Sequence, residues 1–187
     1  MGYSLTPNKY LSYEEQGGLE RILERHKGVD LRNSTMFLLM LWTGTRPSEL
    51  LNLKWRDVDF ISRRIFIDTL KGGRPRYIPI CDELICRLVN LGVKELDDRI
   101  FDIGYRRFEK IWQEWRPVKK KLHSLRHTFA VNLYKKSGYN LRLVQQALGH
   151  AHITTTAIYL EIETSDAELR KCLINDGGGN AIKEELK

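Results

Sequence analysis

Apolar residues recur at two different spacings along this chain, and this change limits the fold more than any other feature. Leu19, Ile22 and Leu23 show the spacing of a helix with one buried face, and similar spacing returns after residue 81. Between these regions, the segments "VDF", "RIFID" and "RYIPI" alternate apolar and polar residues, with turn residues between them. Such alternation predicts three antiparallel strands. We therefore expect an α+β fold that is mainly helical and contains a small three-stranded antiparallel sheet.

Capping residues and glycines predict where the helices begin and end. The capping box "SYEE" starts a helix over residues 13–26, and a largely buried helix through "STMFLLMLWTG" ends at Gly44. In "RPSELL", the proline and the glutamate favour a first helical turn, which places Arg46 at a helix N-terminus. Later helices are expected over "DELICRLVNLG", "YRRFEKIWQEW", "SLRHTFAVNLYKK" and "LRLVQQALG". Trp112 and Trp115 are expected to pack in the core.

The 187 residues are enough for one hydrophobic core. We expect a leader over residues 1–11, one domain over residues 12–164, and a C-terminal helix with a flexible tail over residues 165–187. The three cysteines form no CxxC pair and the start of the chain has no signal peptide, so a cytoplasmic protein without a disulfide framework is expected. The longest apolar stretch, "MFLLMLW", is too short to span a membrane.

The positive charge of the chain is concentrated in its body. The net charge is +7, but residues 161–187 carry four basic and seven acidic side chains, so the first 160 residues hold a net charge of +10. Lys119, Lys120 and Lys121 are consecutive. This distribution favours a polyanionic partner such as nucleic acid. A solvated basic face on an ordinary enzyme is the alternative.

Two histidines and an arginine lie within five residues at one helix start. His123 and His127 are four positions apart, a spacing that suits two zinc ligands on one helix face, with His150 or His152 as a third. A zinc protease needs a glutamate between the two histidines as general base, whereas Arg126 stands there. A guanidinium repels a divalent cation and attracts an anion. A zinc hydrolase is therefore the weaker hypothesis, and we expect no metal site.

The same residues suit a phosphate better. The planar guanidinium of Arg126 matches two phosphate oxygens, and His123 lies one turn earlier on the same face. Arg46 lies at another helix start, and Lys71 lies on a glycine hairpin that can approach a backbone closely. Tyr159 follows nine residues after a histidine that comes after a helix-ending glycine. Each cation alone would be ordinary surface charge, but the set predicts a phosphate site.

Four segments of the chain resemble the catalytic domain of tyrosine recombinases, the family of phage integrases and Xer-type resolvases. "TGTRPSELLNLKWRDVDF" resembles the first arginine segment of that family, and "TLKGGRPRYIPI" resembles its lysine hairpin. "HSLRHTFA" resembles its His-x-x-Arg helix, and "LGHAHITTTAIYL" resembles its histidine and nucleophile segment. The likeness runs from about Leu11 to Leu160, with the segments in the family's order. It implies the catalytic fold of that family for residues 12–164.

The resemblance implies a nucleophile and its proton partners. Tyr159 would attack a DNA phosphodiester and form a 3′-phosphotyrosyl bond, with no cofactor. A free phenol has a pKa near 10, so its proton must leave during the attack. His123 is the implied proton acceptor, and Lys71 would protonate the departing 5′-oxygen.

The resemblance also implies how the phosphate is held. Arg46 and Arg126 would clamp its non-bridging oxygens and neutralise the charge that builds on phosphorus, a task that a metal performs in many nucleases. His150 would hydrogen-bond the transition state. His127 and His152 are assigned structural roles, because the family pattern leaves them no unfilled part.

Double-stranded DNA is the implied partner. Arg74 and Arg76 share the lysine hairpin and join Lys119, Lys120 and Lys121 as expected DNA-binding residues. The resemblance implies a homo-tetramer on paired DNA sites, a monomer or weak oligomer without DNA, and accessory DNA-bending proteins as optional partners. It also implies a nucleoid-associated location, while integration, excision, inversion and resolution stay open as outcomes.

Many family members carry a helical DNA-binding domain before the catalytic one, and eleven residues cannot supply it. The chain is expected to be either a minimal recombinase or an excised catalytic fragment, with a weaker and more salt-sensitive grip on DNA. The C-terminal helix resembles an element that family members pack onto a neighbouring protomer.

A DNA-binding regulator without catalytic activity is the rival of a different class. "LVQQALGHAHITTTAIYL" contains a helix, a glycine turn and a predicted second helix, as in a helix-turn-helix. That interpretation gives no role to His123, Arg126 or Lys71.

Overall fold

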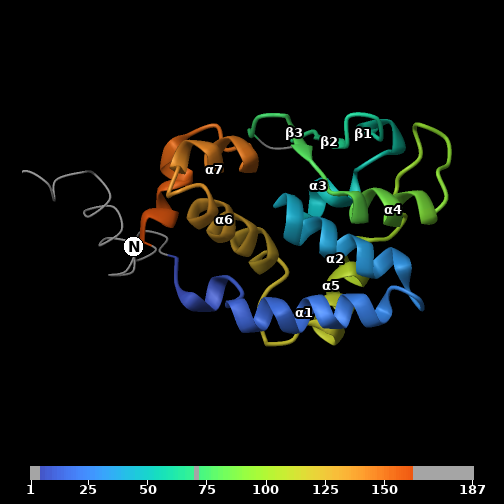
Figure 1. The fold of residues 1–187 in the computed structure, drawn as a ribbon, viewed down its shortest axis with the longest axis horizontal. Coiled ribbons are helices and arrows are strands. Elements are labelled where there is room, and N and C mark those ends of the chain that lie inside the picture. The colour runs from blue at the N-terminus through green and yellow to red at the C-terminus, as the bar shows by residue number, and fades with distance from the viewer. Residues whose placement is uncertain (1–4, 70–71, 162–187) are drawn as a thin grey trace, which may run out of the picture.

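The computed structural model describes residues 5–69 and 72–161 (Figure 1). The α-helices are α1 (Tyr13–His26), α2 (Leu31–Thr43), α3 (Pro47–Leu51), α4 (Asp82–Asn90), α5 (Tyr105–Trp115), α6 (Ser124–Lys136) and α7 (Leu141–Leu148). The 3-10 helices are η1 (Pro7–Lys9), η2 (Trp55–Asp57), η3 (Ile153–Thr155) and η4 (Ala157–Glu161). The strands β1 (Val58–Asp59), β2 (Arg64–Ile67) and β3 (Arg76–Pro79) form one antiparallel sheet in the order β1-β2-β3. The predicted fold class is confirmed.

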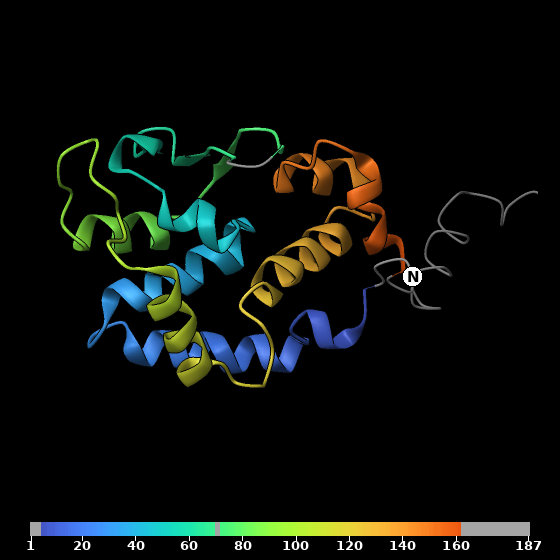
Figure 2. The same ribbon diagram turned by 180° about the vertical axis from the view of Figure 1, so that it is seen from behind.

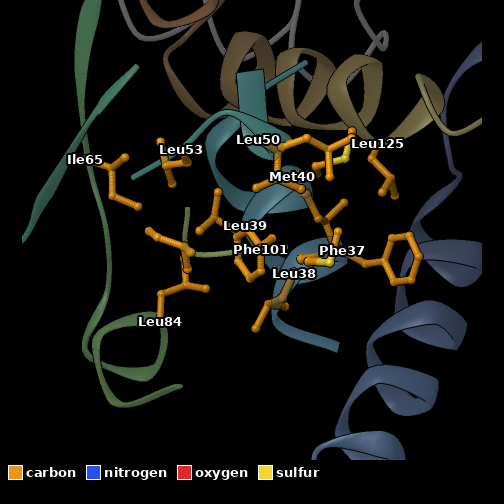
Figure 3. Close-up of a cluster of buried hydrophobic side chains, with 14 of the residues drawn as sticks. Phe37, Leu38, Leu39, Met40, Leu50, Leu53, Ile65, Leu84, Phe101 and Leu125 are labelled. Atoms are coloured by element: carbon orange, nitrogen blue, oxygen red, sulfur yellow. The ribbon is translucent and has the colours of Figure 1, made fainter. Parts of the chain in front are cut away.

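Helix α2 lies at the centre of the fold and packs against α1, α4 and α6 (Figures 1 and 2). Its residues from Asn33 to Leu41 are all buried, and burial on every side is expected for the apolar run from Met36 to Leu41. Figure 3 shows side chains of α2 surrounded by residues from α3, β2, α4 and α6. The labelled members are Phe37, Leu38, Leu39, Met40, Leu50, Leu53, Ile65, Leu84, Phe101 and Leu125.

The sheet turns one face to this core. Ile65, Ile67 and Ile78 are buried, whereas Arg64 and Tyr77 lie on the outer face, where the guanidinium stacks 4.5 Å from the ring centroid. This alternation of buried and exposed residues agrees with the sequence pattern that predicted the strands.

The segment before β3 meets the end of α7. The amide of Arg74 donates a hydrogen bond to the carbonyl of Gly149 at 2.9 Å. Gly149 has a φ of +66°, and a Cβ there would lie 2.6 Å from the Arg74 carbonyl oxygen. Only glycine fits this left-handed helix end so close to another backbone. This contact sets the position of the residues that follow Gly149.

The two tryptophans of α5 pack as predicted. Trp112 is buried, its ring contacts Phe37, and its indole N–H donates to the carbonyl of Lys120 at 2.8 Å. Trp115 is partly buried against the same core, and its ring centroid lies 4.2 Å from that of His26.

Residues 5–11, which the sequence assigned to a leader, pack onto the fold. Leu5 and Leu11 are buried, and the Leu11 amide donates to the Thr128 hydroxyl on α6 at 2.8 Å. The capping box of Ser12 and Glu15 forms as expected. The predicted C-terminal helix and tail lie outside the described residues. Among the residues that are described, no helix has the length and apolar character to cross a bilayer.

Candidate active site

The site is built around Arg126, in the first turn of α6. Its side chain is only 2% exposed, with Nη1 donating to the Gly44 carbonyl at 2.5 Å and Nη2 to the Leu148 carbonyl at 2.7 Å. Gly44 caps α2 and Leu148 is the last residue of α7, so both carbonyls belong to helix ends that lack a full set of intrahelical partners. One guanidinium thus joins the ends of two helices and holds its charge in a fixed place.

His150 lies directly beside Arg126. Its Nε2 is 3.1 Å from Nη2 of Arg126, and its Nδ1 is 2.9 Å from the hydroxyl of Thr156. A guanidinium only donates hydrogen bonds, so Nε2 accepts and the ring proton lies on Nδ1. Desolvation, and then the charges of Arg126, Arg46 and Arg76, lower the pKa of His150 to about 3. His150 is therefore neutral near pH 7.

A buried carboxylate, Glu49, organises the arginines. It is 4% exposed and accepts hydrogen bonds from Nη1 of Arg46 at 2.6 Å and from Nη2 of Arg76 at 3.0 Å. Nη1 of Arg126 lies 3.7 Å away. Desolvation alone would raise the pKa of Glu49, but the hydrogen bond and charge of Arg76, with those of the other arginines, lower it. The sequence identified Glu49 only as a helix-start residue. Its position three residues after Arg46 was the one feature that could have indicated the ion pair between them.

Arg46 is the more accessible of the two arginines that were expected to clamp a phosphate. It is the N-cap of α3, and its amide donates to Oε2 of Glu49 at 2.8 Å. Its side chain is partly exposed, in contrast to that of Arg126. Arg46 can therefore reach a ligand that arrives from solvent.

Tyr159 comes from η4 and turns inward. Its side chain is 1% exposed, and its hydroxyl lies 3.0 Å from Nδ1 of His127. His127, for which a structural role was expected, therefore contacts the predicted nucleophile. The signal was its spacing of four from His123, which puts both rings on one face of α6.

The two arginines that were expected to clamp a phosphate, the three histidines of the site and Tyr159 line one pocket of about 430 Å³, whereas Glu49 does not. Its lining residues are Arg46, His123, Arg126, His127, His150, Thr154, Thr155, Ile158 and Tyr159. Five of the six predicted catalytic residues therefore come together, and the sixth, Lys71, lies outside the described residues.

His123 is the N-cap residue of α6 and is exposed where it lines the pocket. Its pKa is lowered to about 4, by desolvation and then by the positive charges of Arg126 and Arg46. Because His123 is exposed, repulsion by the two neighbouring arginines is the clearer reason why its pKa is lowered. Like His150, it is neutral near pH 7.

Two of the five expected DNA-binding residues are used inside the protein. Arg76 is 8% exposed, pairs with Glu49, and donates from Nε to the carbonyl of Ala147 at 2.7 Å. Lys120 donates to the carbonyl of Tyr10 at 2.7 Å and pairs with the capping residue Glu15. Burial and internal partners remove both cations from the surface, so the expectation for Arg76 and Lys120 is corrected.

The other three expected DNA-binding residues, Arg74, Lys119 and Lys121, are exposed. Lys121 lines a second hollow next to the main pocket, and Arg46 and His123 line both.

The structure can be compared with the two alternative hypotheses, a helix-turn-helix regulator and a zinc hydrolase. The helix-turn-helix hypothesis expected a second helix after α7, but two 3-10 helices, η3 and η4, stand there. His152 is exposed and does not line the pocket. Within residues 5–69 and 72–161, no three histidine, cysteine, aspartate or glutamate side chains come together as a set of metal ligands.

Residues 14–165 match the sequence profile of the phage integrase family. The chain belongs to this family. The chain is 32% identical over 168 residues to tyrosine recombinase XerA of Pyrococcus furiosus, and the match covers 82% of this chain and 57% of that protein. The chain thus spans little more than half the length of this relative.

Two solved structures are similar to this fold. The catalytic domain of bacteriophage HP1 integrase matches with a TM-score of 0.65 and 26% identity, covering 91% of this chain and 96% of that one. XerH recombinase bound to its difH substrate matches with a TM-score of 0.67 and 28% identity, covering 84% of this chain and 50% of that one.

Replacing Glu49 by glutamine should destabilise the integrase fold. Glu49→Gln leaves three guanidinium groups without their shared carboxylate, which should lower the free energy of unfolding by about 3 kcal/mol. Because folding lowers the pKa of Glu49, its contribution is complete above the ordinary carboxylate range and is lost as the pH falls through the folded-state pKa. Urea unfolding from pH 7 to pH 3 measures both effects.

The exposed Glu114 on α5 provides the matched control. Glu114→Gln should change the unfolding free energy by less than about 0.5 kcal/mol. Equal stability of Glu49→Gln and Glu114→Gln at pH 7 would contradict the organising role of Glu49.

Proposed function

We propose that this chain is the catalytic part of a site-specific DNA recombinase that cuts and rejoins strands through Tyr159. The observation that carries the proposal is one pocket lined by the tyrosine, two arginines and His150. Membership of the phage integrase family supports it.

Strand cleavage would proceed by direct attack on phosphorus. The hydroxyl oxygen of Tyr159 bonds to the phosphorus of a phosphodiester, the bond from phosphorus to the 5′-oxygen breaks, and a 3′-phosphotyrosyl link remains. The free 5′-hydroxyl, or one from a partner strand, reverses the reaction and releases the tyrosine. The covalent link keeps the energy of the broken bond, so the cycle requires no cofactor.

The arginines would stabilise the charge that develops during attack. Arg46 and Arg126 suit the two non-bridging oxygens, which carry more negative charge in the transition state than in the substrate. Desolvation, followed by the charge of Arg46, lowers the pKa of Arg126 to about 9, which still leaves it charged at neutral pH. His150 accepts from Arg126 and is held by Thr156, so it orients that guanidinium; to hydrogen-bond the transition state it would donate from Nε2 once the substrate phosphate takes up the guanidinium.

The remaining roles follow from the chemistry of the leaving group. Lys71 is proposed to protonate the 5′-oxygen as it departs. His123, exposed in the pocket, is proposed to contact the substrate phosphate or to accept the phenol proton.

Double-stranded DNA is the proposed substrate, and a homo-tetramer on paired sites is the proposed assembly. The basic body of the chain favours the former, and the XerH relative is bound to a DNA substrate. A recombinase needs two active protomers per duplex to exchange strands, which supports the latter.

A trapping assay in EDTA tests this function. The protein is incubated with a pool of nicked duplexes of randomised sequence, in which cleavage next to the nick releases a short strand that diffuses away. A recombinase leaves a protein-DNA adduct that survives denaturation. A regulator gives no adduct, and a zinc hydrolase is inactive in EDTA, so either result would overturn the proposal.

Lys121 should contribute to DNA affinity through a phosphate contact. Lys121→Ala should weaken binding uniformly across sequences and lower the slope of log K against log salt by about one. Lys94→Ala, in the exposed loop after α4, is the matched control and should change neither quantity. Fluorescence anisotropy over a salt series measures both. An unchanged slope for Lys121→Ala would remove this lysine from the interface.

A further inference from the structure

The hydroxyl of the proposed nucleophile already has a basic partner inside the pocket. Oη of Tyr159 lies 3.0 Å from Nδ1 of His127, and the two rings lie 6.0 Å apart between centroids. His127 is 6% exposed and Tyr159 is 1% exposed. A hydrogen bond between groups this well buried competes little with water.

His127 is in the right protonation state to accept this bond. Desolvation, and then the charges of His123, Arg126 and Lys9, lower the pKa of His127 to about 4. The ring is therefore neutral near pH 7, and a neutral imidazole has one nitrogen that accepts. With Nδ1 as that nitrogen, the phenol donates its proton along the 3.0 Å contact.

We propose that His127, rather than His123, accepts the proton of Tyr159 during attack. This inference rests on the proposed recombinase function. As the bond from Oη to phosphorus forms, the proton moves from Oη to Nδ1 of His127, and the 5′-oxygen leaves with a proton from the general acid. On rejoining, Nδ1 returns the same proton to Oη when the phosphotyrosyl bond breaks.

The substrate itself would make this transfer easier. In the free protein, desolvation and the positive charges of Arg126 and Lys9 disfavour a positive charge on His127. A bound phosphodiester brings a negative charge among the arginines, and the Glu49 carboxylate lies behind them. Protonated His127 therefore costs less free energy with DNA in the pocket than without it.

His123 suits a different contact. Its ring lies edge-on to that of His127, with centroids 5.0 Å apart, at the exposed start of α6. From there it can donate or accept a hydrogen bond to the incoming phosphate, while His127 faces the buried phenol.

Two amide substitutions test which atom matters. In His127→Asn the side-chain oxygen can occupy the place of Nδ1, whereas in His127→Gln the amide reaches the place of Nε2. Adduct formation is measured in a single turnover at saturating DNA. We expect both variants to be about 10²-fold or more slower than the native protein, with Asn at least about tenfold faster than Gln, because only Asn keeps the phenol in position.

The pH profile tests the proton transfer. The native rate should level off above the pKa of His127. In both amide variants the rate should rise about tenfold per pH unit towards the phenol pKa, because hydroxide must remove the proton instead. DNA affinity should change less than about threefold in either variant, since neither substitution alters the arginines.

Several outcomes would overturn the inference. Native-like rates in both variants, equal rates in Asn and Gln, or lower rates with the native pH profile would each reduce His127 to a residue that shapes the pocket. Thermal melting confirms that both variants are folded. If the native protein forms no adduct, the proposed function fails, and that result is distinct from any result in the variants.

Discussion

Tyr159→Phe should abolish the covalent adduct while leaving DNA binding intact. The substitution removes one oxygen atom, which is the nucleophile in the proposed reaction. The phenyl ring keeps its place in a buried cluster that also contains Ala130, Tyr134 and Leu148, so the fold should lose only about 1 kcal/mol for the hydrogen bond to His127. The assay is denaturing gel electrophoresis of the trapped complex, with anisotropy for DNA affinity.

The result for Tyr159→Phe shows whether Tyr159 or another side chain is the nucleophile. An adduct that persists in Tyr159→Phe would show that another side chain attacks the phosphate. Tyr134→Phe is the matched control, because Tyr134 is a buried tyrosine of α6 in the same core cluster and does not line the pocket. It should form the adduct at the native rate.

Arg126→Lys should slow adduct formation by about 10³-fold. Lysine keeps the positive charge but offers a single ammonium, which cannot hold the Gly44 and Leu148 carbonyls and a phosphate oxygen together. Losing those two bonds should also lower the unfolding free energy by about 2–4 kcal/mol. Single-turnover cleavage and urea unfolding measure the two effects separately.

Arg87 on α4 provides a control for burial. It is as buried as Arg126 but pairs with Glu24 and Glu83, away from the pocket. Arg87→Lys should destabilise the fold to a similar degree without changing the cleavage rate of the folded protein. If Arg126→Lys likewise changed stability alone, the guanidinium would hold the helices together and take no part in the chemistry.

Local sequence signals predicted the secondary structure because the forces involved are local. The capping box at Ser12 and the left-handed Gly44 and Gly149 end helices through contacts within a few residues. The alternation of apolar and polar residues in β2 and β3 is also a local pattern, and it predicted these strands.

Local sequence patterns could not predict contacts between distant segments of the chain. Arg76 and Glu49 are 27 positions apart, and Lys120 and Tyr10 are 110 positions apart. A cation in a sequence gives no sign of whether it will be buried against a partner or exposed to DNA. For this reason the sequence assigned Arg76 and Lys120 to the DNA surface, whereas both hold the fold together.

The histidines show the same limit within the site. The family resemblance indicated His123, Arg126 and His150, and the structure brings these residues into one pocket. The resemblance could not show that His127 contacts the phenol, because this contact depends on where η4 places Tyr159. The position of a short 3-10 helix is a tertiary property, and no local pattern sets it.

The most direct test is to identify the amino acid that carries the DNA. The adduct formed in EDTA is digested with nuclease and trypsin and examined by mass spectrometry. The peptide from Leu143 to Arg170, whose single tyrosine is Tyr159, should carry a nucleotide through its 3′-phosphate. A nucleotide on any other peptide, or the absence of a linked nucleotide, would contradict the proposal that the arginine pocket activates this phenol.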